Sequence, residues 1–262
     1  NLPLFGKCIE VAVDIQLRKF CEKFNLFGVH QHGFRRSRST ATAVQTAVMN
    51  WRSKKAKGKF QAALLFDLSA AYDLLDKELF LRKAELYGIT GAALHWLNSY
   101  LSERSQIVQV NEARSSEKML DYGTPQGSSC SCLMFALFVG DIGQWLDDCL
   151  VLAFADDTFI SIEANTMDEL HEKMEVQGEK VLDFFTKNLM VTNPSKTELL
   201  VFRPTLTRVQ PVPGTITLHG ENITETDSTK LLGVWISNDL KWGKNIDELK
   251  KGLNYSVSIL WR

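Results

Sequence analysis

The sequence has 262 residues, of which 45% are hydrophobic and 23% charged, a composition typical of a globular protein that can bury a sizeable core. Its longest apolar run, Leu133 to Val139, is much shorter than the roughly 20 residues of a membrane helix, so we expect no membrane partner. The formal net charge of −1 argues against nucleic-acid binding through overall basicity. Local basic runs at 35–38 and 52–59 qualify that argument, although each also suits a solvated loop.

Five cysteines are spread along the chain without any C-x-x-C spacing, so we do not expect a zinc site. Their odd number predicts reduced thiols, as in proteins of the cytosol or nucleus. No signal peptide precedes the first helical pattern, and the first residue is Asn1 rather than Met, which predicts a chain cut from a longer polypeptide. We therefore expect an intracellular protein of the nucleus and cytoplasm.

The first half of the chain combines several helical patterns with one strongly apolar strand. Apolar residues at helical spacing indicate a helix before Gly28, and Ser39 or Thr40 can cap a second one. The continuous apolar run that ends at Asp67 is typical of a strand buried on both faces. The expected elements are helices over 7–24, about 40–51, 76–87 and 90–101, strands over 60–66 and 105–110, a turn-like stretch over 28–38 and a hairpin connection over 111–118.

The second half opens with a loop, Gly123 to Gly127, and an apolar run to Leu146 that indicates a buried helix. Two apolar stretches then flank Asp156 and Asp157, the pattern of a β-hairpin with acidic residues at its turn. The expected elements are strands over 149–155, 158–162, 197–203, 215–219 and 230–236 and helices over 166–189 and 244–260. This order predicts an α+β fold in which the strands form one antiparallel sheet backed by helices.

Three carboxylates stand at the ends of apolar strands. Asp67 follows the strand over 60–66, and Asp156 and Asp157 occupy the predicted hairpin turn. Burying strands that end in carboxylates is costly unless a cation or another partner is near. If the strands lie side by side, the side chains meet at one edge of the sheet, where they can hold two magnesium ions about 3.5–4 Å apart for phosphoryl transfer. The alternatives are a solvated turn for the Asp pair and a helix cap for Asp67.

Six segments, read in chain order, resemble the motifs of reverse transcriptases encoded by retrotransposons without long terminal repeats. The family patterns are Q-x-G-F-R…S-T, D-L-S-x-A-[FY]-D, P-Q-G-S, [FY]-x-D-D, N-x-x-K-T and the L-G of the primer grip. The matching segments are Gln31-His-Gly-Phe-Arg-Arg-Ser-Arg-Ser-Thr40, Leu65-Phe-Asp-Leu-Ser-Ala-Ala-Tyr-Asp73, Gly123-Thr-Pro-Gln-Gly-Ser128, Phe154-Ala-Asp-Asp157, Asn193-Pro-Ser-Lys-Thr197 and Leu231-Leu-Gly-Val234. The resemblance covers nearly the whole chain and looks closest to the jockey-like branch.

The resemblance implies a right-hand polymerase fold with an antiparallel palm sheet, backing helices, fingers and only the start of a thumb. It places the fingers at 1–60 and 77–125, the palm at 61–76 and 126–238, and the thumb at 239–262. It implies RNA-templated DNA synthesis, or reverse transcription, as part of a retrotransposon polyprotein. The implied partners are an RNA template, a DNA primer and deoxynucleoside triphosphates, and the implied cofactors are two Mg²⁺ ions, for which Mn²⁺ can substitute.

The resemblance also assigns the catalytic carboxylates. Asp67 and Asp156 are expected to ligate the metals, with Asp157 an adjoining and less direct carboxylate. The backbone carbonyl of Leu68 is expected to complete one metal's shell.

Nucleotide binding is expected from three of the resembling segments. The amides of Ser69, Ala70, Ala71 and Tyr72 are expected to contact the triphosphate, since backbone N–H groups are ready anion donors. The ring of Tyr72 is expected to act as a steric gate against a ribose 2′-hydroxyl. Gln126 and Gly127 are expected beside the nucleotide and template, and Lys196 as a charge stabiliser or proton donor to pyrophosphate. The simpler readings are a core tyrosine, a turn glycine and a surface lysine.

Contacts with template and primer are expected from two further segments. Phe34, Arg35, Arg36 and Arg38 are expected to follow the template through sequence-independent phosphate contacts. Leu232 and Gly233 are expected in the primer grip. For Phe34, core packing is the alternative.

Two other functions compete with reverse transcription. An RNA-dependent RNA polymerase shares the palm, but its loop carries a Ser-Gly…Thr pattern and its turn reads Gly-Asp-Asp, unlike Gly123 to Gly127 and Ala155 to Asp157 here. A degenerate or co-opted fragment that binds nucleic acid or protein without catalysis is the alternative outside enzymes.

Overall fold

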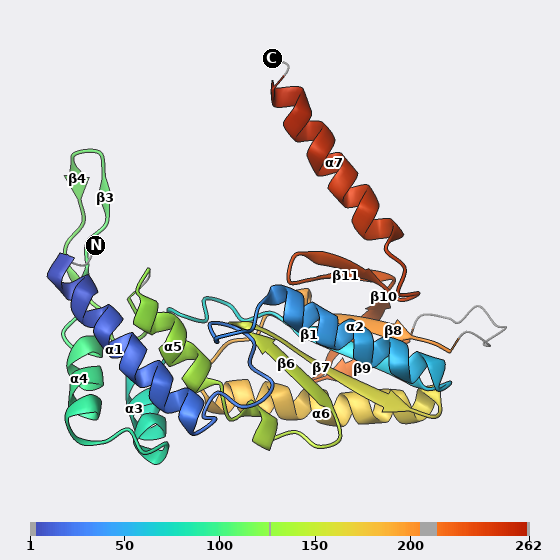
Figure 1. Ribbon diagram of the computed structural model, residues 1–262, viewed down its shortest axis with the longest axis horizontal. Coiled ribbons are helices and arrows are strands. Elements are labelled where there is room, and N and C mark those ends of the chain that lie inside the picture. Colours follow the sequence, from blue (N-terminus) through green and yellow to red (C-terminus); the bar gives the residue numbers. More distant parts are fainter. Residues whose placement is uncertain (1–3, 126, 205–213, 261–262) are drawn as a thin grey trace.

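The structure is a computed structural model that describes residues 4–125, 127–204 and 214–260. Most of the described residues lie in helices or strands (Figure 1). The helices are α1 (Leu4–Lys23), α2 (Thr40–Ala56), α3 (Lys77–Leu86), α4 (Gly91–Leu101), α5 (Ser129–Phe138), α6 (Met167–Lys187) and α7 (Gly243–Leu260). The strands are β1 (Phe60–Phe66), β2 (Ser105–Gln106), β3 (Gln109–Val110), β4 (Ala113–Arg114), β5 (Lys118–Met119), β6 (Leu150–Phe154), β7 (Asp157–Ala164), β8 (Glu198–Phe202), β9 (Thr215–Leu218), β10 (Glu221–Thr226), β11 (Ser228–Leu231) and β12 (Val234–Ser237).

The central sheet has six strands in the order β6-β7-β1-β8-β10-β9. Strand β1 pairs antiparallel with both of its neighbours, β7 and β8. Strands β8 and β10 run parallel, so the sheet is mixed rather than purely antiparallel as expected. The predicted α+β class is confirmed.

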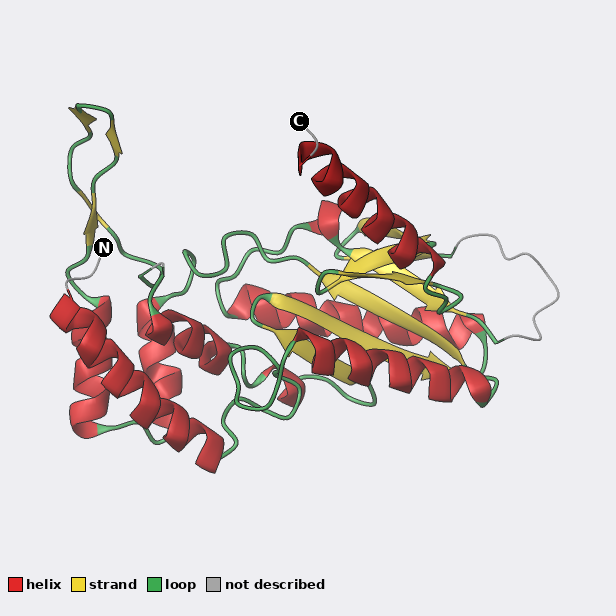
Figure 2. Ribbon diagram, turned by 45° about the horizontal axis from the view of Figure 1, so that its top comes forward, coloured by secondary structure: helices red, strands yellow, loops and turns green. Residues whose placement is uncertain are grey.

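Helices cover both faces of the sheet, α6 on one and α2 on the other (Figure 2). Successive side chains of a strand point to opposite faces, and β1 supplies both layers. Ala62 and Leu64 join the core on the α6 side, whereas Ala63 joins the core on the α2 side. The apolar run that ends at Asp67 is therefore explained by burial on both faces.

Trp51 anchors α2 on its face of the sheet. The indole is 1% exposed, and its ring centroid lies 4.6 Å from that of Phe202 and 5.9 Å from that of Phe159. Its Nε1 donates a hydrogen bond of 2.8 Å to Ser161 Oγ, so the polar atom of the buried ring is satisfied.

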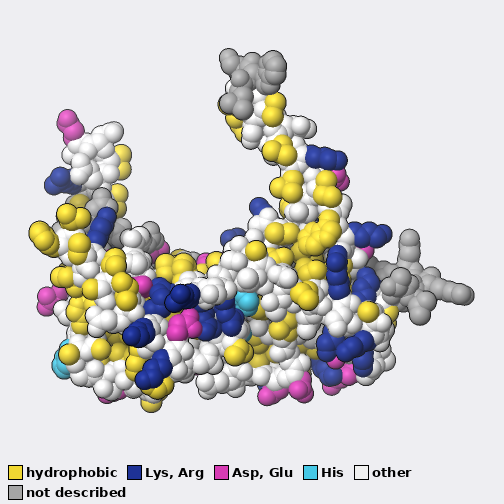
Figure 3. Space-filling view, viewed as in Figure 1, with side chains coloured by type: hydrophobic (Ala, Val, Ile, Leu, Met, Phe, Trp, Pro, Cys, Tyr) yellow, Lys and Arg dark blue, Asp and Glu magenta, His cyan; other side chains and the backbone are white. Residues whose placement is uncertain are grey.

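A second group of helices, formed by α1, α3, α4 and α5, lies beside one end of the sheet (Figure 1). The β3–β4 hairpin projects from this group, and α7 projects from the opposite part of the molecule. An open hollow lies between these two arms (Figure 3). The general shape is a base with two arms, in which the base contains the sheet.

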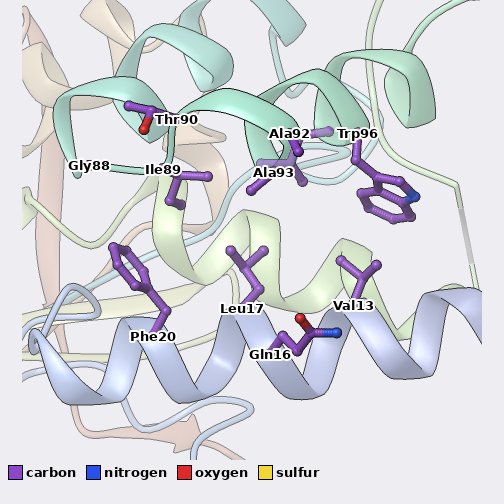
Figure 4. Close-up of a pocket in the computed structure, with 11 residues that line it drawn as sticks. Val13, Gln16, Leu17, Phe20, Gly88, Ile89, Thr90, Ala92, Ala93 and Trp96 are labelled. Carbon is purple, nitrogen blue, oxygen red and sulfur yellow. The ribbon is translucent and has the colours of Figure 1, made fainter.

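A cavity of about 530 Å³ lies between α1 and α4 (Figure 4). Its lining is mostly apolar and includes Leu17 and Phe20 from α1 and Ala93 and Trp96 from α4. None of the residues that line it is among those expected to bind metal, nucleotide, template or primer. The site implied by the sequence must therefore lie elsewhere.

Several boundaries differ from those expected. The apolar helix α5 ends at Phe138 rather than near Leu146, and a short 3₁₀ turn, Ile142–Gln144, follows. At Gly140, just after the helix, a side chain would collide with the carbonyl oxygen of Leu26, so the backbone passes close to the segment that follows α1. The strand expected over 105–110 is split into two short exposed strands.

The C-terminal strands also differ from expectation. Strand β10 was not expected, because its sequence is mostly polar and carries little apolar alternation. The strand expected over 230–236 is a hairpin of β11 and β12 instead. Leu232 and Gly233, at φ 48° and 87°, form its turn, since both central residues of such a turn take positive φ.

All five cysteines are free thiols, as expected, because none is bonded to another. Across the described residues, no helix is both long enough and apolar enough to traverse a bilayer.

Candidate active site

The fold brings Asp67 next to the acidic turn. The ladder between β1 and β7 ends with Phe66 opposite Thr158, so the next residues, Asp67 and Asp157, stand opposite each other. Strands β6 and β7 are joined by a tight turn in which Phe154 pairs with Asp157. Asp156 lies within that turn, so the three carboxylates converge at one edge of the sheet, as the sequence predicted.

The charges of these carboxylates act on one another. Loss of water raises the pKa of Asp157 above its usual range, and the negative charges of Asp156 and Asp67 raise it further. Like charges held close together favour a bound cation, because the cation neutralises their repulsion. The electrostatics therefore fit a site for a positively charged group.

Tyr72 belongs to the same neighbourhood. Its pKa is raised, first by loss of water, then by Cys132 and by the charge of Asp156. The ring packs on Phe135 of α5 with centroids 4.8 Å apart, and the backbone carbonyl accepts a hydrogen bond of 3.0 Å from the amide of Thr124. The ring is therefore only partly buried against α5, and the hydroxyl is near enough to Asp156 to be affected by its charge.

The segment that follows α6 lies beside Asp67. Lys196 Nζ lies 3.1 Å from Asp67 Oδ2, so the expected phosphate-binding lysine pairs with an expected metal ligand. The amide of Asn193 donates to the carbonyl of Asp67 at 2.9 Å. The amide of Ser69 donates to the carbonyl of Val191 at 2.9 Å, so this strand pairing already uses one of the four amides expected to hold the triphosphate. The expectation is corrected for Ser69; the amides of Ala70, Ala71 and Tyr72 are not part of this pairing and stay candidates.

The same pairing sets the direction of the Leu68 carbonyl. Successive residues of a strand point their backbone polar groups to opposite sides. Asp67 and Ser69 bond to the 191–193 segment, so the carbonyl of Leu68 between them points toward the side of β7. That is the side on which the acidic turn lies.

The described residues contain no ready-made group of three or more His, Cys, Asp or Glu side chains around one metal position. A magnesium ion in enzymes of phosphoryl transfer usually takes only one or two carboxylates, the remaining ligands being water and substrate phosphates. Asp67, Asp156 and the Leu68 carbonyl fit that kind of partial shell. They do not form a closed structural metal site.

The loop before α5 lies beside Tyr72. Gly127 is exposed and adopts φ 79°, a left-handed conformation that suits glycine, and a side chain there would meet no other atom. Ser128 then caps α5 by accepting from the amide of Ser131. Gln126, expected beside the nucleotide, lies outside the described residues.

The β11–β12 hairpin reaches the acidic turn from the other side. A small cavity is lined by Leu232 of the hairpin turn together with Phe154 and Asp157. Gly233, the other expected primer-grip residue, is exposed at the tip. The hairpin turn therefore lies beside the acidic turn.

Comparison with known proteins decides the family. The family described as reverse transcriptase (RNA-dependent DNA polymerase) matches residues 2–236, which is most of the chain. The chain belongs to the reverse transcriptase family.

Its relatives among curated proteins are retrotransposon polymerases. A Drosophila melanogaster protein named "Probable RNA-directed DNA polymerase from transposon BS" is 25% identical over 258 residues, 94% of this chain and 28% of the relative. The RNA-directed DNA polymerase from the mobile element jockey of Drosophila funebris is 22% identical over 264 residues, 98% of this chain and 28% of the relative. The chain spans little more than a quarter of the length of these relatives. The resemblance to jockey-like reverse transcriptases is confirmed.

Solved telomerase structures share the fold. Candida tropicalis telomerase in complex with a fragment of telomeric RNA superposes with a TM-score of 0.58 at 12% identity, over 88% of this chain and 36% of the telomerase. The apo form truncated of its C-terminal domain gives a TM-score of 0.57 at 14% identity, over 90% of this chain and 44% of that one. At such low identity the likeness concerns the fold alone, and it confirms the right-hand polymerase fold.

The four residues expected on the template side of this reverse transcriptase chain separate into two pairs. Phe34 and Arg36 are exposed, and the Phe34 ring lies 6.4 Å from the ring of Phe154 beside the acidic turn. Arg35 points inward: its side chain is 8% exposed and lies 2.7 Å from Glu22 in an ion pair. Arg38 is half-buried and donates to the carbonyl of Val29 at 2.7 Å.

The placement of Arg35 therefore corrects the expectation that its side chain follows the template. Its guanidinium neutralises Glu22 and donates to the carbonyl of Gly28 at 2.6 Å, so its charge is already used inside the protein. The same pairing lowers the pKa of Glu22. Sequence motifs show which residue types occur but not which way a side chain faces. The template contacts of Phe34, Arg36 and Arg38 stay predictions.

We expect the Asp157→Asn variant of this reverse transcriptase chain to be more heat-stable than the wild type at neutral pH without divalent ions. A carboxyl whose pKa is raised by folding destabilises the folded state once it ionises, so the gain should disappear as the pH falls below the usual carboxyl range. Thermal unfolding of both proteins from pH 3 to pH 8 measures this, with a higher melting temperature of the variant expected at pH 7 and no difference at pH 3. The matched control is Asp247→Asn on exposed α7, and an equal gain there would contradict the assignment.

Proposed function

We propose that this chain performs RNA-templated DNA synthesis as the polymerase segment of a retrotransposon protein. The observation that carries the proposal is the strand register that sets Asp67 opposite Asp157 at the acidic turn. Membership in the reverse transcriptase family supports the same reaction. The exposed Lys196, paired with Asp67, adds a cation within reach of a triphosphate.

The carboxylates of Asp67 and Asp156 and the carbonyl of Leu68 are the proposed metal ligands, with Asp157 close by. Bound there, two Mg²⁺ or Mn²⁺ ions would supply activation of the primer 3′-hydroxyl and neutralisation of charge on the leaving pyrophosphate. The pKa of Asp157, raised by loss of water and then by the charges of Asp156 and Asp67, supports this donor set. Lys196 contributes positive charge toward the pyrophosphate, and Tyr72 limits the space beside the sugar.

The proposed partners are an RNA template, the 3′ end of a DNA primer and deoxynucleoside triphosphates. The proposed fingers are residues 1–60 and 77–125, the palm 61–76 and 126–238, and the thumb begins at 239. The hollow between the β3–β4 arm and α7 is the proposed place for the template–primer duplex (Figure 3). The proposed locations in the cell are the nucleus and cytoplasm, where a retrotransposon copies its RNA.

The test is primer extension on an RNA template with a DNA primer, measured for the chain and for any longer polypeptide that carries it. We expect incorporation of deoxynucleotides that requires Mg²⁺ or Mn²⁺ and stops when a chelator is added. Preference for ribonucleotides would favour the RNA polymerase instead. Binding of the template–primer without extension, in the chain and in the longer polypeptide alike, would favour a co-opted fragment without catalysis.

A further inference from the structure

The acidic turn is held in a conformation that its own sequence does not favour. Ala155, the residue before Asp156, adopts φ 60°, in the left-handed region. A residue with a Cβ is strained in this conformation, so contacts from outside the hairpin help to hold it. The direction of the two Asp side chains depends on the peptide on either side of Ala155.

The segment before α2 supplies those contacts. It lies alongside β6 like an additional strand, with Gln31 bridging Ala153 in parallel register. The amide of His32 donates to the carbonyl of Ala153 at 2.7 Å, and the amide of Ala153 donates to the carbonyl of His30 at 3.0 Å. A segment remote in sequence therefore forms the edge of the sheet next to the hairpin turn.

The side chain of Gln31 reaches the turn itself. It is fully buried, and its Oε1 accepts hydrogen bonds from the amide of Gly33 at 2.7 Å and from the amide of Ala155 at 3.3 Å. Two N–H groups converge on this atom, so it is the oxygen rather than the nitrogen of the side-chain amide. Without that oxygen, the amide of Ala155 would lose its acceptor in a dry interior.

The residues around Gln31 hold its side chain against the Ala155 amide. A Cβ at Gly33 would collide with the amide nitrogen of Ala155, so only glycine lets the segment come so close. Arg35 and Arg38 both donate to the carbonyl of Gln31, at 3.4 Å and 3.3 Å, and brace its backbone. Within the described residues the Nε2 of Gln31 has no hydrogen-bond partner. A hydrophobic side chain of the same length would fill the space without the free-energy cost of burying that N–H group unpaired. What such a side chain would lack is the acceptor.

We propose that Gln31 is a positioning residue of the polymerase site: it holds the Ala155 peptide and thereby sets the direction in which the carboxylates of Asp156 and Asp157 face. The inference rests on the proposed function, because it concerns the same carboxylates. It adds a residue that touches neither metal nor nucleotide and acts through the backbone of the turn. Loss of a side chain that orients a metal ligand typically weakens metal binding or activity by about 10- to 100-fold.

The test compares Gln31→Met with Gln61→Met. Gln61 is the matched control because it is also a buried glutamine whose side chain is hydrogen-bonded to the backbone: its Nε2 donates to the carbonyl of Trp51 at 2.8 Å. It lies at the opposite end of β1 from the acidic turn. Both variants lose a buried polar contact, so thermal unfolding corrects for any general loss of stability. Only Gln31→Met removes the acceptor of the Ala155 amide.

Two measurements on the folded proteins do not depend on turnover. The first is hydrogen exchange in the peptide that covers 153–157, which we expect to speed up in Gln31→Met and to stay as in the wild type in Gln61→Met. The second is Mn²⁺ affinity in a complex with RNA template, a chain-terminated DNA primer and the next deoxynucleotide. We expect about 10-fold weaker Mn²⁺ binding for Gln31→Met only.

Primer extension completes the comparison. For Gln31→Met we expect kcat to fall about 10- to 100-fold and the half-saturating Mg²⁺ concentration to rise, while the KM for template–primer stays constant. Wild-type exchange, Mn²⁺ affinity and Mg²⁺ dependence in Gln31→Met would overturn the positioning role alone. Absence of both Mn²⁺ binding and extension in the wild type would instead overturn the proposed function, and the positioning role with it.

Discussion

Asp156→Asn is expected to lower the rate of primer extension by about a thousandfold or more, since loss of one charged metal ligand removes several kcal/mol of transition-state stabilisation. Asn has the same shape as Asp and tolerates turn conformations, so the hairpin between β6 and β7 should remain. The measurement is single-nucleotide extension under saturating substrate, with thermal unfolding in parallel to show that the variant is folded.

Glu179→Gln, at an exposed position of α6, is the control for a general effect of removing one negative charge, and it should extend as the wild type does. The result bears directly on the metal site, because the charge of Asp156 raises the pKa of both Asp157 and Tyr72. Extension at the normal rate by a folded Asp156→Asn protein would remove this carboxylate from the metal site and leave the proposed mechanism without its second ligand.

For Tyr72→Val we expect discrimination against ribonucleotides to fall by about 100-fold. That is the scale on which a pocket distinguishes substrates that differ by a small group. The ring packs on Phe135 with centroids 4.8 Å apart and lies close to the charge of Asp156. Valine removes most of the ring and opens space for a 2′-hydroxyl. The measurement is the ratio of kcat/KM for a deoxynucleotide to that for the matching ribonucleotide, in which any loss of folded protein cancels.

Tyr72→Phe is the matched control for the role of the ring. It keeps the bulk and loses only the hydroxyl, whose pKa is raised by burial, by Cys132 and by Asp156. If bulk makes the gate, Tyr72→Phe should discriminate as the wild type does. A Tyr72→Phe variant that accepts ribonucleotides as readily as Tyr72→Val would assign the discrimination to the hydroxyl, and unchanged discrimination in both variants would place the gate elsewhere.

Local patterns predicted which residues lie together, but not how each side chain is oriented. Asp67, Asp156 and Tyr72 lie in one neighbourhood, as their motifs predicted. Arg35 lies in the predicted segment and yet points inward to Glu22. A motif records the order of residue types, whereas the facing of a side chain depends on which charges and carbonyls the folded segment brings near it.

Gln31 is a second case in which a sequence motif does not reveal what a side chain contacts. The sequence presents it as one position of a fingers motif, and no local signal links it to a turn 124 residues later in the chain. Its partner is a backbone amide, which every residue except proline carries, so no residue type at the other end marks the contact. Only the pairing of the 30–32 segment with β6 reveals it.

The sequence by itself determined the α+β class, the positions of most helices, and the six motifs in family order, because these depend on apolar spacing and capping among residues close in the chain. Tertiary structure decided that Asp67 stands opposite Asp157, that β10 joins the sheet in parallel, and that Leu232 turns back toward the acidic residues. Those features follow from strand register between distant segments. Register is selected by simultaneous burial on both faces of the sheet, a condition that no short stretch of sequence contains.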